Sequence, residues 1–101
     1  MSSLDALTRT VKEKAVQNVS LGHTVMFDLG GDGVIFWDGT QNPAVISNEK
    51  AEAETTLKLT AASLQKMLDG GMNATLAYMT GSLKISGSMG VALKINSMME
   101  D

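Results

Sequence analysis

The sequence predicts a small domain of the α+β class, and two patterns predict it. Apolar residues recur every three or four positions near both ends of the chain, and they alternate with polar residues through much of residues 24–59. The apolar share of 44% and the charged share of 19% are those of a folded protein. Since 101 residues suit one domain, we expect residues 1–101 to fold as a single unit.

The first expected element is an amphipathic helix. Its apolar positions recur at helical spacing, at Leu4, Leu7, Val11 and Ala15. Ser3 stands where its hydroxyl can accept a hydrogen bond from a free backbone N–H of the first turn, as an N-cap does. The segment 18–22, which ends in glycine, predicts the end of this helix.

Strands are expected at residues 24–29, 34–37, 44–47, 53–59 and 82–86. In the first, Val25, Phe27 and Leu29 alternate with more polar residues, which predicts one face turned to the core. The segment 30–33 (Gly-Gly-Asp-Gly) predicts a hairpin turn, because glycine adopts positive φ at low cost. The first four strands therefore precede the short helices, and the fifth follows them.

Helical spacing returns after the fourth strand. A helix is expected from Thr60 to the paired glycines at 70–71, and a shorter one from Ala74 to Met79 with Asn73 as its N-cap. A final helix is expected from Ser88, its N-cap, to about Met99. The order is helix, four strands, two short helices, strand, helix.

The final helix carries more apolar surface than one packing face requires. At about 100° per residue, its apolar side chains cover an arc of roughly 220°, interrupted by Asn96. A helix that rests on one sheet needs a stripe of only a little over ~100°. The surplus predicts contact with a second layer, a partner chain or a bound ligand; the alternative is a fully buried terminal helix.

Composition excludes several classes of protein. The formal net charge is −3, whereas nucleic-acid-binding domains usually carry more basic than acidic residues. Cysteine is absent, so disulfides, zinc–thiolate sites and thiol nucleophiles are excluded. No apolar run approaches the roughly 20 residues that span a bilayer, and the N-terminal residues carry acid where a signal peptide carries base. We therefore expect a cytoplasmic protein.

Catalytic and metal-binding patterns are weak. His23 is the single histidine, and no serine stands in a Gly-x-Ser-x-Gly sequence. The glycine-rich segment 30–33 joins two strands instead of opening a helix, so it does not have the context of a phosphate-binding loop. Asp28, Asp32 and Asp38 lack the alternating oxygen ligands of a calcium loop. We expect no catalytic residue, no metal site and no cofactor, and the prediction is that the protein is not an enzyme.

The C-terminal half resembles the sterol carrier protein two family, also called nonspecific lipid-transfer proteins. The run Gly-x-Leu-Lys-Ile-x-Gly-x-Met-Gly is its most specific part. The segments that carry the resemblance are Ala53-Glu54-Thr55-Thr56-Leu57, Leu64–Gly70, Met72-Asn73 and Gly81-Ser82-Leu83-Lys84-Ile85-Ser86-Gly87-Ser88-Met89-Gly90. In the N-terminal third the chain matches in pattern more than in residues.

The resemblance implies a five-stranded, mostly antiparallel sheet with helices packed over one face and a hydrophobic tunnel between the layers. It implies that the tunnel is lined from the inward strand faces, the short helices and the last helix. The lipid-binding residues expected on this basis are Phe27, Leu29, Leu57, Met67, Leu68, Met72, Tyr78, Met79, Leu83, Ile85, Met89 and Leu93.

The resemblance also implies a function, a non-catalytic intracellular lipid carrier that holds fatty acid, fatty acyl-CoA, sterol or phospholipid. The chain ends Met99-Glu100-Asp101, without the peroxisomal targeting tripeptide of some members, and its length resembles the bacterial members. Because their hosts mostly lack sterols, an acyl chain is the favoured cargo. The alternative is an accessory protein-interaction or lipid-presenting module, for example in quinone biosynthesis, with the last helix as its interface.

The expected partners are a lipid and, transiently during transfer, a membrane surface, with no nucleic acid. A monomer is expected, with a dimer left open. A charged lipid head group would lie at the rim of the tunnel, where Lys58, Lys84 and Lys94 are its candidate partners.

Overall fold

The computed structural model describes residues 3–17, 21–41 and 43–99. The elements follow in the order α1 (Leu4–Gln17), β1 (Thr24–Asp28), η1 (Gly30–Asp32), β2 (Val34–Asp38), β3 (Val45–Ser47), β4 (Thr55–Lys58), α2 (Ala61–Leu68), α3 (Ala74–Thr80), β5 (Lys84–Ser86) and α4 (Met89–Met99). This order confirms the helices and strands expected from the sequence. The glycine-rich segment between β1 and β2 contains a short 3-10 turn, η1, and Gly30 and Gly33 have positive φ there.

The five strands form one sheet in the order β3-β2-β1-β4-β5. Three neighbouring pairs are antiparallel, and the pair β1–β4 is parallel. The sheet is therefore mostly antiparallel, as expected. The parallel pair arises because the segment after β3 crosses back beyond β1 before β4 begins, and a parallel pair needs such a crossover.

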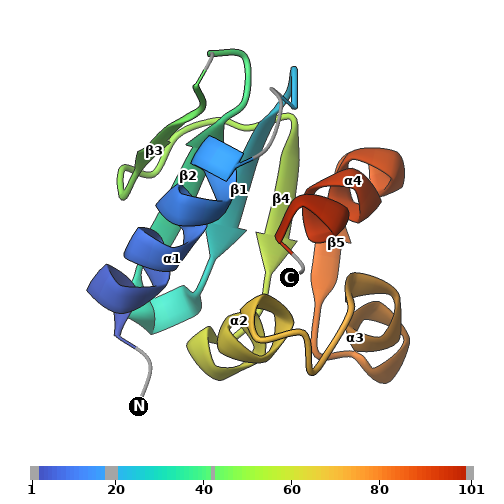
Figure 1. The fold of residues 1–101 in the computed structure, drawn as a ribbon. Helices are drawn as coiled ribbons and strands as arrows, with labels where there is room; N and C mark the ends of the chain where they lie inside the picture. The colour runs from blue at the N-terminus through green and yellow to red at the C-terminus, as the bar shows by residue number, and fades with distance from the viewer. Residues whose placement is uncertain (1–2, 18–20, 42, 100–101) are drawn as a thin grey trace.

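The helices lie on one side of the sheet (Figure 1). α1 contacts β3, α4 contacts β4 and β5, and α1 contacts α4, so these two helices form one layer over the sheet. α2 and α3 complete that layer beyond the ends of β4 and β5. Alternate side chains of each strand point to the sheet face beneath the helices, and the register brings the apolar ones of neighbouring strands side by side. This face of the sheet is therefore apolar.

The core lies between the sheet and the helix layer. Phe27 on β1 lies in register with Ile35 on β2 and with Leu57 on β4, and all three are fully buried. Helix residues close the core from the other side, namely Leu7, Val11, Leu64, Met67 and Ile95. The strand alternation that the sequence shows is therefore the pattern of this buried face.

Side-chain caps fix the starts of the helices where the sequence predicts them. The hydroxyl of Ser3 accepts from the Ala6 N–H at 3.1 Å, and the Ser88 hydroxyl accepts from the Val91 N–H at 3.2 Å. Asn73 accepts from the Leu76 N–H at 2.7 Å, and α3 ends at Gly81 in the left-handed conformation. Each cap satisfies a backbone N–H that the first turn of a helix leaves free.

Candidate functional site

The apolar surface of α4 is divided between the core and the outside. Ala92 and Ile95 are fully buried, and Val91 and Met98 nearly so. Leu93 nevertheless keeps 42% of its surface exposed. The fully buried terminal helix that the sequence left as an alternative is therefore not what forms, and the surplus apolar surface faces outward.

Helix α3 is built in the same two-sided way. Its small residues Ala74 and Ala77 are fully buried against the core. On its outer side, Leu76 is 51% exposed and Met79 is 77% exposed. Since these two residues are three positions apart, they lie on the same side of the helix. Two neighbouring helices thus both present large apolar side chains to the outside.

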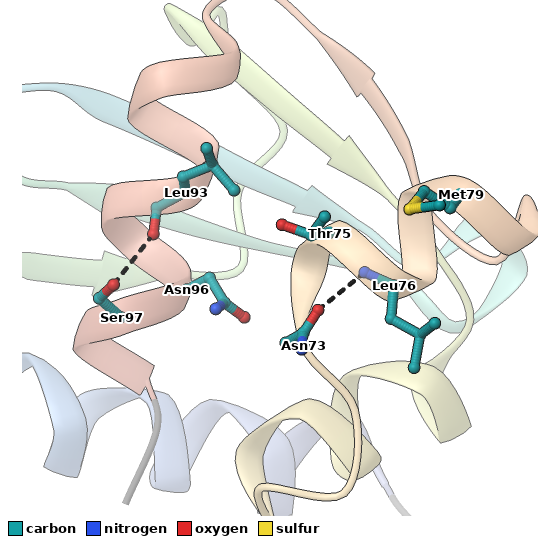
Figure 2. A pocket seen from close by; sticks show the side chains of 7 residues that line it. All are labelled: Asn73, Thr75, Leu76, Met79, Leu93, Asn96 and Ser97. Atoms are coloured by element: carbon teal, nitrogen blue, oxygen red, sulfur yellow. Dashed lines mark hydrogen bonds between the residues drawn. The ribbon is translucent and has the colours of Figure 1, made fainter.

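These side chains border a groove between α3 and α4, named here the α3–α4 groove (Figure 2). Its volume is about 470 Å³, and it is lined by Asn73, Thr75, Leu76, Met79, Leu93, Asn96 and Ser97. Figure 2 shows Leu93 and Asn96 reaching from α4 toward the side of α3. The volume lies in the range of roughly 300–1,000 Å³ that is usual for small-molecule sites.

Asn96 explains the polar interruption in the apolar arc of α4. Its side chain is 8% exposed, and its Oδ1 accepts from the backbone N–H of Ala74 at 3.1 Å. That N–H belongs to the first turn of α3, which has no partner for it within its own helix. The bond therefore ties α4 to the start of α3 at the groove.

The other polar side chains of the groove bond mainly to nearby backbone. Asn73 caps α3, and the Ser97 hydroxyl donates to the Leu93 carbonyl at 3.3 Å. Among the described residues that line the groove, none titrates. The groove offers apolar contact and uncharged polar groups, which suits binding, and its lining holds no acid or base that could activate the Thr75 or Ser97 hydroxyl.

The two lowered pKa values of the described residues are explained by turns and strand ends. The hydrogen bond from His23 Nδ1 to Glu54 Oε1, at 3.1 Å, lowers the pKa of that carboxyl, and the Thr24 N–H lowers it further. The hydroxyl and the N–H of Thr40 lower the pKa of Asp38. These residues hold the ends of strands in place, and neither carboxyl lines the groove.

Two features are absent from the described ranges, a cluster of metal ligands and a membrane-spanning helix. No three His, Asp or Glu side chains gather there closely enough to hold a metal ion. Within the same residues, no helix has the length and apolar character needed to cross a bilayer.

The twelve residues expected to contact lipid fall into three groups. Six lie in the core with almost no exposed surface: Phe27, Leu29, Leu57, Met67, Leu68 and Leu83. Of these six, Leu29 lines a second pocket, at the end of β4 and β5. Met72 and Ile85 are partly buried against that core. Tyr78, Met79, Met89 and Leu93 are exposed, and of these Met79 and Leu93 line the α3–α4 groove. Except for Leu29, contact of a ligand with the first group would require the helices to move apart.

Five groove residues were not among the expected set: Asn73, Thr75, Leu76, Asn96 and Ser97. Leu76 could have been found from its spacing, because it shares a face with Met79 while Ala74 and Ala77 occupy the other. The four polar residues could not have been found from the sequence, because only the packing of α3 beside α4 brings them together.

The fold matches solved structures of sterol carrier proteins. A structure of sterol carrier protein 2 from Aedes aegypti, in complex with the C16 fatty acid palmitate, covers 98% of this chain and 96% of its own at a TM-score of 0.78 and 16% identity. The ubiquinone synthesis protein UbiJ-SCP2 covers 96% of this chain and 79% of its own at a TM-score of 0.62 and 18% identity. At these identities the likeness shows the fold.

Sequence comparison extends the likeness. The hydroxysteroid dehydrogenase-like protein 2 of Xenopus laevis is 31% identical over an alignment of 98 positions, which covers 93% of this chain and 23% of that protein. The chain thus spans about a quarter of the length of this relative. The SCP-2 sterol transfer family matches residues 4–100, nearly the whole sequence. With the sheet order, the helix layer and this match in agreement, the chain belongs to the SCP-2 sterol transfer family.

Proposed function

We propose that this chain is a non-catalytic lipid carrier that holds one acyl chain in the α3–α4 groove. The observation that carries the proposal is the exposure of Leu76, Met79 and Leu93 around one cavity of about 470 Å³. Large apolar side chains gathered in this way usually mark a binding surface. Membership of the family, and the palmitate bound by the Aedes aegypti relative, support a lipid as the ligand.

An acyl chain fits the groove in chemistry. The thioether of Met79 is flexible and polarisable, so it adapts to different chain shapes. Moving a ~16-carbon chain out of water gains about 13 kcal/mol before the costs of association, at about 0.8 kcal/mol for each CH₂. An open groove covers only part of the chain, so the gain here is smaller.

Partial cover suits a carrier. A lipid in a membrane is already out of water, so its transfer into an open groove costs the free energy of the apolar surface that the groove leaves exposed, which favours return of the lipid to a membrane. Tight enclosure would favour storage, whereas an open site favours loading and release. The carrier would then meet a membrane only while it exchanges its cargo.

The test is native mass spectrometry of the purified chain mixed with palmitate. We expect a monomer carrying one palmitate, displaced by other long-chain fatty acids and not by short ones such as hexanoate. A monomer that gains no fatty-acid mass at micromolar palmitate would overturn the proposal.

A second candidate function is that of an accessory module that docks on a partner protein. Met89 and Tyr78, at 41% and 47% exposure, add outward-facing apolar side chains on the two helices that flank the groove. The fold shared with the ubiquinone synthesis protein UbiJ-SCP2 is compatible with such a role. A lipid-free dimer in native mass spectrometry, dissociated by Leu93→Asp, would favour this function over the carrier.

A further inference from the structure

A pair of like charges lies at the end of β4 and β5. Lys58 and Lys84 are directly opposite each other in the antiparallel register of these strands, so both side chains leave the same face of the sheet. Like charges placed directly opposite each other destabilise a strand pair. This arrangement raises the question of what offsets the repulsion.

The described part of the chain supplies no partner for either ammonium group, since neither lysine side chain makes a hydrogen bond or ion pair there. Asp28 lies next to Lys58 in the register of β1 and β4, but its Oδ1 accepts from the Gly30 N–H at 2.9 Å. This bond holds the turn after β1 and leaves the negative charge of Asp28 beside Lys58. The row of Asp28, Lys58 and Lys84 across three strands therefore carries two positive charges and one negative charge, a net charge of +1.

Both lysines line one pocket of about 340 Å³, which shares no lining residue with the α3–α4 groove. Ser82, before β5, brings a hydroxyl group to the same pocket, where it also lies 3.3 Å from the Thr80 hydroxyl. Thr60 lines the pocket too, but its hydroxyl caps α2 and donates to the Ser63 hydroxyl at 3.0 Å. Gly30 and Gly81 bring backbone without side chains. Positive charge and one hydroxyl group thus converge in a pocket that three separate segments form, residues 29–30, 58–60 and 81–84.

We propose that this pocket, named here the lysine pocket, binds an oxyanion of the phosphate type. A phosphate monoester carries a charge of about −1.5 to −2 and three acceptor oxygens, enough to meet both ammonium groups and a hydroxyl together. A single carboxylate would balance only one of the two lysines. The phosphate belongs to a small phosphorylated compound or to the head group of a phospholipid, and the experiment separates the two sources.

The first measurement follows backbone amide shifts in the full chain during titration with glycerol 3-phosphate at constant ionic strength. We expect saturable shifts at Gly30, Gly81 and Ser82. Lys84→Gln should raise the Kd at least about tenfold, because it removes a charge-assisted hydrogen bond. Lys94→Gln is the matched control, since Lys94 is an exposed lysine of α4 outside the pocket, and it should leave the Kd unchanged.

The second measurement is sedimentation with vesicles of phosphatidic acid or of phosphatidylcholine alone. Binding to phosphatidic acid that Lys84→Gln abolishes assigns a lipid head group. Amide shifts without vesicle binding assign a small phosphorylated compound. Shifts and sedimentation that are the same in Lys84→Gln and the unmodified chain, or absent with both probes, overturn the proposal.

Two controls keep this result separate from the function proposed above. Lys84→Gln should unfold at the same or a higher temperature than the unmodified chain without phosphate, since it removes a like-charge contact. It should also bind palmitate unchanged, because the lysine pocket and the α3–α4 groove share no residue. The experiments can therefore overturn phosphate binding in the lysine pocket without overturning palmitate binding in the α3–α4 groove, and the reverse.

Discussion

At the scale of single residues, Gly87 shows what the glycine in the family-like run Gly-x-Leu-Lys-Ile-x-Gly contributes. Its φ is +107°, and a Cβ added there would overlap the Glu54 carbonyl oxygen and lie 3.0 Å from the Thr55 Cα. The next residue, Ser88, donates its N–H to the buried Thr55 hydroxyl at 3.2 Å and caps α4. Close backbone approach at Gly87 is thus what joins β4, β5 and α4.

Gly87→Ala is expected to lower the free energy of unfolding by about 2–4 kcal/mol, because strained φ and backbone overlap act together. Urea unfolding followed by the fluorescence of Trp37, the single and fully buried tryptophan, measures it. Gly81→Ala is the matched control: φ is +84° there, but a Cβ meets nothing within 4 Å. If Gly87→Ala lowers the free energy of unfolding no more than Gly81→Ala does, the close backbone contact at Gly87 does not stabilise the fold.

Leu93 is the residue on which the α3–α4 groove can be tested most directly. Leu93→Trp should fill part of the groove and raise the Kd for palmitate roughly tenfold, the equivalent of about two lost CH₂ contacts. Since the Leu93 side chain is 42% exposed, the larger ring has room and the fold should survive. Competition with a fluorescent fatty acid gives the Kd.

The matched control is Val16→Trp, an exposed apolar position on α1 outside the α3–α4 groove. It should bind palmitate as the unmodified chain does. Unchanged affinity in folded Leu93→Trp would place the lipid elsewhere in the molecule.

At the scale of secondary structure elements, α3 and α4 act together. Each buries one set of apolar residues and exposes another, and the bond between Asn96 and the Ala74 N–H joins them. A helix of only seven residues such as α3 has little stability of its own, so it depends on contacts of this kind. The width of the groove therefore depends on a polar contact.

Asn96→Ala is expected to cost about 1–3 kcal/mol of unfolding free energy, because it leaves the buried Ala74 N–H without an acceptor. Hydrogen exchange of the α3 amides should speed up more than that of the sheet amides. In the control Ser97→Ala, the lost hydroxyl bonds only within α4, so α3 should exchange at its original rate. Equal protection of α3 in the two variants would show that Asn96 does not hold the groove.

At the scale of the whole molecule, the parallel pair β1–β4 closes the sheet between segments far apart in sequence. Its start is held by reciprocal bonds: the Thr24 N–H donates to Glu54 Oε2 at 3.0 Å, and the Glu54 N–H donates to the Thr24 hydroxyl at 2.9 Å. His23 adds a third contact to the same carboxylate. These bonds fix the register in which β1 pairs with β4.

This carboxylate predicts a dependence of stability on pH. The pKa of Glu54 is lowered in the folded state, so its contribution is full above the ordinary value of 4.5 and is lost as the pH falls through the lower, folded value. The Tm difference between the unmodified chain and Glu54→Gln should therefore be largest near pH 6 and shrink toward pH 3. Glu52→Gln, which changes an exposed neighbour, should show no such trend; a constant difference for Glu54→Gln would contradict the linkage.

Much of this architecture could be predicted from local sequence. Alternation in β1 and β4, the caps Asn73 and Ser88 and the glycine stop at Gly81 each depend on contacts within a few residues. The lining of the groove was predicted only at Met79 and Leu93. A buried and an exposed leucine, such as Leu83 and Leu93, look alike in a sequence, because burial depends on which elements pack over them.

By itself, the sequence determined the order of helices and strands, the face of each strand that turns inward and the excess of apolar surface on α4, because these follow from periodicity along one segment. Only the tertiary structure decided that the excess faces α3 across a groove, that Asn96 bridges the two helices and that Lys58 meets Lys84. Those features join residues up to 26 positions apart in the chain, and packing of the finished fold sets their distances.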